Sequence, residues 1–207
     1  MQVKVKFWRG EFMRMKRKNE STQRMVLLAL LTAVVAVLSY FGGFIRIFTV
    51  ASISLTLIPV VLGAAILGVG AGAWLGAVSG AVFFMTADAV FWLGLSIPGT
   101  IITVMVKGIA AGLLAGLTYK MLKRINHYLA VIVSAVVCPI VNTGIFIIGC
   151  FVFFIDTVSA GAMAEGMSVG GYLIIAFVGL NFVFELLLNI IVSPALLKII
   201  NIKNHKA

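Results

Sequence analysis

Charged residues are the first thing that this sequence lacks. Only 11% of its 207 residues are charged, which is less than half the usual fraction, whereas 62% are hydrophobic. A membrane-spanning helix needs about 20 apolar residues, so the length allows about six spans with short connections. We therefore predict an all-α integral membrane protein, a compact bundle of six transmembrane helices with both termini in the cytoplasm.

Groups for catalysis and metal binding are also scarce. The two histidines, His127 and His205, fall in predicted connections, with no carboxylates at metal-ligand spacing. No serine–histidine or paired-aspartate arrangement lies in the spans, and the phosphate-binding sequence G-x-x-x-x-G-K-[ST] is absent. We expect no catalytic residue, no metal and no cofactor, so any coupled ATP hydrolysis belongs to partner subunits.

The sequence holds only two cysteines, Cys138 and Cys150, in one apolar run. Twelve helical residues separate them by about 18 Å along the axis. That separation is too large for a disulfide. We predict that both pack in the protein core.

Acidic residues number six against sixteen lysines and arginines, and the basic residues are unevenly placed. Predicted inner segments hold fourteen of them, and the predicted outer loops hold only Arg46. This asymmetry is typical of cytoplasmic loops, with anionic lipid of the bilayer as the counter-charge. It argues against a nucleic-acid partner, because no basic helix is free of the membrane.

The hydrophobic runs predict the organisation of the chain. Residues 1–23 form a basic cytoplasmic or interfacial segment, 24–202 the six-helix membrane domain, and 203–207 a cytoplasmic tail. The second span is short for a bilayer, so neighbouring helices must shield it. The predicted spans are residues 25–41, 54–67, 71–93, 100–122, 128–155 and 169–197.

Small residues organise the region from Ile53 to Gly80. It reads as two apolar helices with a short turn containing Gly68, Gly70 and Gly72. Glycines recur every four residues from Gly72 to Gly80, and again at 108, 112 and 116. Such tracks let helix backbones approach closely inside a membrane.

A few polar residues within the spans are candidate ligand contacts, because ionisable groups in a membrane are costly and often functional. The alternative is structural: the asparagines join helices and Glu185 pairs with Lys107. Aromatic residues of the same region are candidate pocket walls, although most such rings serve in packing. The candidate substrate-binding residues are Arg46, Phe84, Trp92, Lys107, Asn142, Phe146, Asn181 and Glu185.

Residues 24–202 resemble the substrate-binding S components of energy-coupling factor (ECF) vitamin transporters. The resemblance includes an Ala-x-x-x-Ala pattern in the first span, Ala29 to Ala33. LTLIPVVLGAAILGVGAGAWLG, from residue 55, is similar to the family's second and third helices. NFVFELLLNIIVSPAL, from residue 181, is similar to its last helix.

This resemblance implies a subunit that binds one vitamin in an outer-half pocket built from the first outer loop and spans four to six. It also implies two kinds of partner in the bacterial cell membrane: an EcfT-type scaffold subunit and two EcfA-type ATP-binding subunits. The scaffold would dock on the small-residue face of Ala29, Ala33 and Ala36. The S component would reorient in the membrane to release its substrate inside.

The ligand is predicted from the charge of the pocket. Lys107 and Arg46 favour a carboxylate-bearing vitamin over cationic thiamin, with Asp88 as the counter-argument. The acid-proline signature of riboflavin members is missing from residues 42–54, and the sequence most resembles the pantothenate members. Folate, riboflavin and pyridoxine stay open. So do a gradient-driven secondary transporter, a membrane enzyme and a purely structural subunit.

Overall fold

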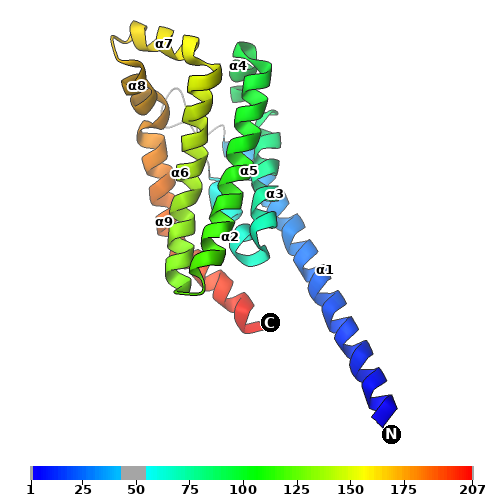
Figure 1. Ribbon diagram of the computed structural model, residues 1–207. Helices are drawn as coiled ribbons and strands as arrows, with labels where there is room; N and C mark the ends of the chain where they lie inside the picture. The colour runs from blue at the N-terminus through cyan, green and yellow to red at the C-terminus, as the bar shows by residue number, and fades with distance from the viewer. Residues whose placement is uncertain (1, 43–54, 207) are drawn as a thin grey trace.

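The computed structural model describes the backbone of residues 2–42 and 55–206, and the side chains of residues 21–42, 55–175 and 182–198. This part of the chain is helical throughout (Figure 1). Its elements are α1 (Gln2–Gly42), α2 (Leu57–Leu67), α3 (Val69–Phe83), α4 (Ala87–Leu95), α5 (Ile97–Leu122), α6 (His127–Phe153), α7 (Ile155–Ala164), α8 (Val169–Tyr172), the π-helical segment η1 (Leu173–Val178) and α9 (Gly179–Lys206).

The long helix α1 joins the basic N-terminal segment to the first predicted span without a break. It has 41 residues, of which Ser21–Gly42 are apolar enough to cross a membrane. Its first half extends away from the other helices (Figure 1). The start of α1, the end of α9 and the α5–α6 turn lie at one end of the bundle, here called the basic end. Which side of the membrane it faces stays a prediction.

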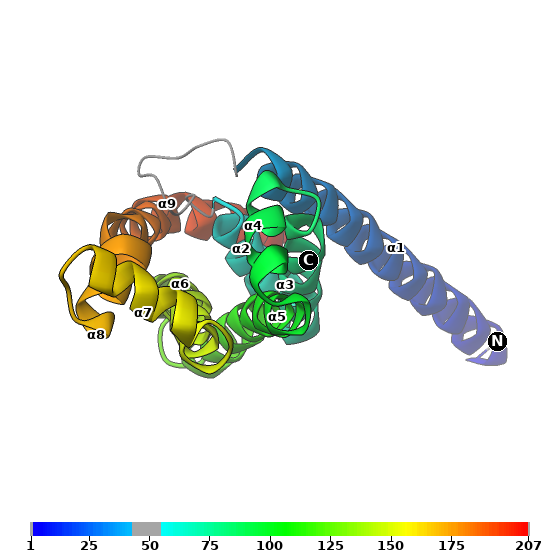
Figure 2. The same ribbon diagram turned by 90° about the horizontal axis from the view of Figure 1, so that it is seen from above.

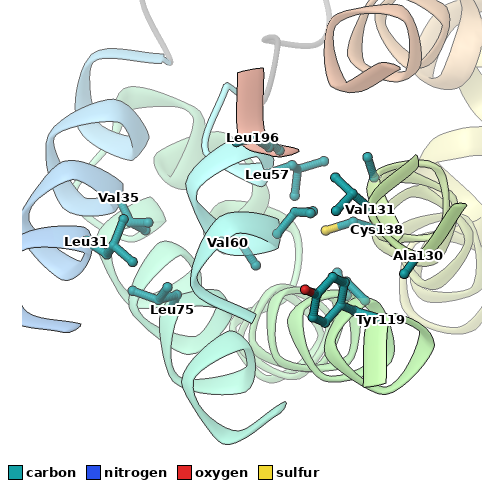
Figure 3. Packing of buried hydrophobic residues seen from close by; sticks show 14 of the residues in the cluster. Leu31, Val35, Leu57, Val60, Leu75, Tyr119, Ala130, Val131, Cys138 and Leu196 are labelled. Atoms are coloured by element: carbon teal, nitrogen blue, oxygen red, sulfur yellow. The ribbon is translucent and has the colours of Figure 1, made fainter. Parts of the chain in front are cut away.

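The short helix α2 lies at the centre of the core. Its 11 residues extend about 16 Å, roughly half of a bilayer's hydrocarbon thickness. Figure 3 shows α2 between side chains of α1 and α3 on one side and of α6 on the other. Val60 and Val61 are each only 1% exposed. The prediction that neighbouring helices shield this short segment is confirmed.

The tightest contact in the fold joins α3 to α5 along two rows of glycines. A Cβ atom added to Gly76 would collide with the carbonyl group of Gly108, and one added to Gly108 would collide with that of Gly76. Gly72 and Gly112 oppose each other in the same way one helical turn further on. The two predicted glycine tracks therefore pack against each other, backbone to backbone.

The turn between α2 and α3 is shorter than predicted. Only Gly68 lies between the helices, with a φ of 106° that favours glycine. Gly70 and Gly72 belong to α3 instead. The sequence placed them in the turn because glycine is common there, whereas Gly72 serves the contact with α5.

The predicted third span is not one straight helix. The helix α3 ends at Phe83, and the axis of the next helix, α4, makes an angle of 83° with it. Thr86 adopts an extended conformation at the start of α4, and its hydroxyl donates to the carbonyl of Phe83 at 2.7 Å. Asp88 lies in the first turn of α4, where a negative charge suits the helix dipole. The predicted span over residues 71–93 therefore consists of two helices with a sharp bend between them.

The second half of the chain also contains a helix where a loop was predicted. Residues 156–168 were expected to form an outer loop, but α7 covers most of them and turns by 93° into Val169–Ile175. Gly161 makes this corner possible, because a Cβ there would contact the ring of Tyr172 at 2.7 Å. Figure 2 shows α6, α7, α8 and the first part of α9 on one side of the molecule and α1 to α5 on the other, with the C-terminal end of α9 reaching the side of α2 and α3.

The number of spans is counted here within the described residues. Three helices are long and apolar enough to cross a membrane, and the total rises to five if each bent pair forms one span. The additional short helix α2 is apolar but has only 11 residues. The several apolar helices agree with a membrane protein, and the exact count of six stays a prediction.

Candidate functional site

The described residues line a cavity in the half of the bundle away from the basic end. Its walls come from α1 to α6, with Lys107 and Asn142 among the lining residues. The cavity volume is about 70 Å³, enough for a few water molecules. Ligand pockets typically enclose about 300–1,000 Å³. A vitamin therefore needs the cavity to widen or to extend beyond the described residues.

Lys107 brings a positive charge to this cavity from the middle of α5. Its ammonium nitrogen lies 5.1 Å from the ring centre of Phe146 on α6 and 5.7 Å from that of Phe83 on α3. Both rings stabilise the cation through their π faces. Within the described residues, the contacts of this ammonium group are with rings rather than with a carboxylate. Lys107 therefore presents a positive charge at the cavity wall, held against two aromatic rings.

Two further polar groups share the cavity wall with Lys107. Asn142 comes from α6 and Asp88 from the first turn of α4. The amide of Asn142 can both donate and accept hydrogen bonds, while a carboxylate only accepts them. The described wall thus combines one cation, one acid, one amide and several hydroxyl groups, a composition suited to a small polar organic molecule.

The aromatic candidates separate into two groups. Trp92 of α4 stacks edge to face on Phe146 at 5.4 Å and on Phe154 at 5.2 Å between ring centres. These three rings belong to a second hydrophobic cluster with Cys150, Val158 and Leu173. Phe146 alone among them also contacts Lys107. Neither Trp92 nor Phe146 is among the described lining residues of the cavity, and Trp92 packs on Phe146, which in turn contacts Lys107.

Phe84 is absent from the cavity wall in the described part of the chain, and its neighbour Phe83 lies there instead. The rings of Phe83 and Phe84 contact each other at 6.1 Å between centres. Sequence reasoning missed Phe83 because two adjacent phenylalanines gave no way to choose which one points inward. Phe83 follows Ser79 by four residues, so the two share one face of α3. Once Ser79 is known to line the cavity, this spacing indicates that Phe83 lines it too.

Of the remaining candidates, only Glu185 has a described side chain. Glu185 on α9 is 6% exposed and acts electrostatically on Lys107, yet it is not among the described lining residues. The side-chain amide of Asn189 donates to the backbone carbonyl of Glu185 at 2.8 Å. Arg46 falls outside the described residues, as does the side chain of Asn181.

The predicted partner face lies on α1. Ala29 and Ala33 are exposed and Ala36 is half-buried, so the first two remain open to another helix. On the opposite side of α1, Leu31 and Val35 enter the core. Docking of a scaffold subunit on this face stays a prediction.

The two cysteines are both buried and free, Cys138 in the main core and Cys150 in the second cluster. The predictions of no disulfide and of core packing are therefore confirmed. Within the described residues, no group of three or more histidine, cysteine, aspartate or glutamate side chains could hold a metal ion.

Comparison with protein families gives a match that spans most of the chain. Residues 23–200 match the family described as ECF transporter, substrate-specific component. The chain belongs to this family. No curated protein and no solved structure matches it.

As an ECF substrate-specific component, the protein is a membrane subunit of a transporter, and the family consists of transport subunits rather than enzymes. Membership also implies association with EcfT and EcfA subunits, as the sequence resemblance had indicated. The apolar helices agree with a multi-pass membrane protein. A bacterial plasma membrane is inferred from the family.

Proposed function

We propose that this substrate-specific component binds a small carboxylate-bearing vitamin, with pantothenate favoured, and delivers it inward as part of an ATP-driven importer. The observation that carries the proposal is the position of Lys107. Its ammonium group lies at a cavity wall, against two aromatic rings and beside an amide. A lysine in such surroundings pairs readily with a carboxylate.

The binding step uses the groups on either side of Lys107. Phe146 and Phe83 hold the lysine side chain at the cavity wall, and these apolar rings around it strengthen its attraction for an anion. Asn142 provides a hydrogen-bonding partner for an amide group of the ligand. Arg46, Asn181 and Glu185 are proposed as further ligand contacts, and Phe84 and Trp92 as rings that shape the pocket.

Energy for uphill transport comes from partner subunits in this proposal. The chain contains no phosphate-binding loop, so two EcfA-type subunits hydrolyse ATP and an EcfT-type subunit contacts the face of Ala29, Ala33 and Ala36. The substrate-loaded protein then reorients in the membrane. Small exposed residues on α1 suit such a contact because they allow close and movable helix packing.

Calorimetric titration of the purified protein in detergent tests this proposal. Pantothenate, folate, riboflavin and pyridoxine are titrated in turn into the wild type and into Lys107→Ala. Tight pantothenate binding that is lost in the variant supports both the ligand and its anchor. Binding of another vitamin would replace pantothenate. No binding by any vitamin, together with proton-dependent uptake in liposomes, would favour a gradient-driven transporter.

A further inference from the structure

Three hydroxyl groups form a row along the wall of the cavity that Lys107 also lines. Ser39 of α1 donates to Ser79 of α3 at 3.1 Å between oxygens, and Ser79 donates to Thr56 at the start of α2 at 3.4 Å. All three residues line the cavity. Thr56 is only 4% exposed, so the row leads into the protein interior.

The hydroxyl row differs from several other hydroxyls of the bundle in its hydrogen-bond acceptors. Serine and threonine in apolar helices commonly donate to the backbone carbonyl one turn earlier. Thr32, Ser134 and Ser193 do so, at 2.7–2.8 Å. In the hydroxyl row, by contrast, Ser39 and Ser79 direct their hydrogens to side chains on neighbouring helices.

Counting donors shows that the hydroxyl row is incomplete by itself. Three hydroxyl groups carry three donor hydrogens, and the row's two hydrogen bonds use two of them, so within the described residues one donor at an end of the row is left without an acceptor. A buried donor without an acceptor costs free energy. The row is therefore suited to an additional acceptor placed in the cavity that it lines.

The hydroxyl row and Lys107 lie close enough to contact one small molecule. Ser79 and Phe83 are four residues apart on α3, so they share a face and are separated by about 6 Å along the axis. Phe83 in turn contacts the ammonium group of Lys107. A molecule with a carboxylate at one end and hydroxyl groups one to two helical turns away matches both ends.

We propose that Ser39, Ser79 and Thr56 form a subsite that recognises the hydroxyl groups of a hydroxylated carboxylic acid whose carboxylate lies at Lys107. This inference rests on the proposed function. The substrate hydroxyls accept the spare hydrogen of the row and donate in return, which selects hydroxylated acids over equally long apolar ones. Ser79, in the middle of the row, is the specificity-determining residue.

The competing explanation is that the row only joins α1, α2 and α3. A purely structural set of hydrogen bonds would affect all ligands equally when it is removed. A subsite would change the preference between ligands with and without hydroxyl groups. The decisive quantity is therefore a ratio of two dissociation constants, measured on the same protein.

The experiment titrates pantothenate and its analogue lacking both hydroxyls, N-(3,3-dimethylbutanoyl)-β-alanine, into the wild type, Ser79→Ala and Thr56→Val. The second variant keeps side-chain volume while removing the hydroxyl. The control is Ser134→Ala, a buried hydroxyl on α6 that bonds its own backbone and lies outside the described cavity wall. Size-exclusion chromatography reports folding of each variant.

We expect the wild type to prefer pantothenate, and the preference to fall by about 3- to 10-fold in Ser79→Ala and Thr56→Val. The preference of Ser134→Ala should equal that of the wild type. An unchanged preference in both row variants would overturn the subsite while leaving the proposed function intact. Absence of pantothenate binding to the wild type would overturn both.

Discussion

Helix α5 meets its two neighbours in opposite ways. Toward α3 it presents Gly108 and Gly112, and the two backbones touch with no side chains between them. Toward α6 it presents Lys107, which lies against the ring of Phe146 at a cavity wall. Adjacent residues of one helix thus serve rigid packing on one face and, in the proposed function, ligand binding on the other. Substitutions on the first face should cost stability, and those on the second should cost affinity.

The largest effect is expected on the glycine face. In Gly76→Ala the new methyl group would meet the backbone carbonyl of Gly108, which cannot rotate away as a side chain could. Overpacking of this kind should lower the melting temperature in detergent by roughly 2–12 °C. The control is Gly144→Ala on α6, where an added Cβ meets nothing within 4 Å. Equal melting temperatures for the two variants would contradict the close contact of α3 and α5.

A second prediction extends the comparison to the exposed face of α1. Leucine at Ala29 and Ala33 together should abolish co-purification with an EcfT-type subunit, because bulky side chains prevent close helix approach. Vitamin binding and melting temperature should stay unchanged, since both alanines are exposed. Val26→Leu, at a residue 63% exposed on the same helix, is the control. Retained co-purification of the double variant would place the scaffold contact elsewhere.

The smallest effect is expected from the ring beneath Lys107. Phe146→Leu removes one of the two cation–π contacts and should weaken pantothenate binding by about 2- to 5-fold in calorimetry. Phe154→Leu is the matched control, because Phe154 also stacks on Trp92 and has no described contact with Lys107. Equal weakening in the two variants would indicate that Phe146 acts only through packing.

The sequence alone predicted the parts of this fold that depend on spacing. Glycines at four-residue intervals in two segments indicated close helix contacts, and the structure pairs one track with the other. The short second span was expected to be shielded, and α2 is buried. These predictions succeeded because helical periodicity alone decides which residues share a face.

The break between α3 and α4 was missed because hydrophobicity runs through it unbroken. Its local signal is the sequence Thr86-Ala-Asp88, a capping threonine followed by an acid in the first helical turn. The helix α7 was missed because Gly161 and Gly166 indicated a loop, although the alanines of the segment favour a helix. Short local signals of this kind are easily outweighed by a long hydrophobic stretch when helix boundaries are predicted from a sequence.

The candidate site was predicted in part. Lys107 and Asn142 were selected because polar groups in a membrane are costly, and both line the cavity. Ser39, Ser79 and Thr56 were not, because hydroxyls usually bond their own helix and attract no attention in a sequence. Tertiary packing decides which side chains of neighbouring helices these three hydroxyls contact. The spacing of residues within one helix does not reveal those contacts.

The most direct test of the central claim is a pair of titrations that changes only the ligand's charge. Pantothenate and its alcohol analogue pantothenol, which lacks the carboxylate, are titrated into the wild type and Lys107→Met. The account predicts that the wild type prefers pantothenate, and that the variant binds it roughly 10- to 100-fold more weakly while binding of pantothenol hardly changes. If the substitution weakens both ligands equally, or neither, Lys107 is not the anchor of the carboxylate.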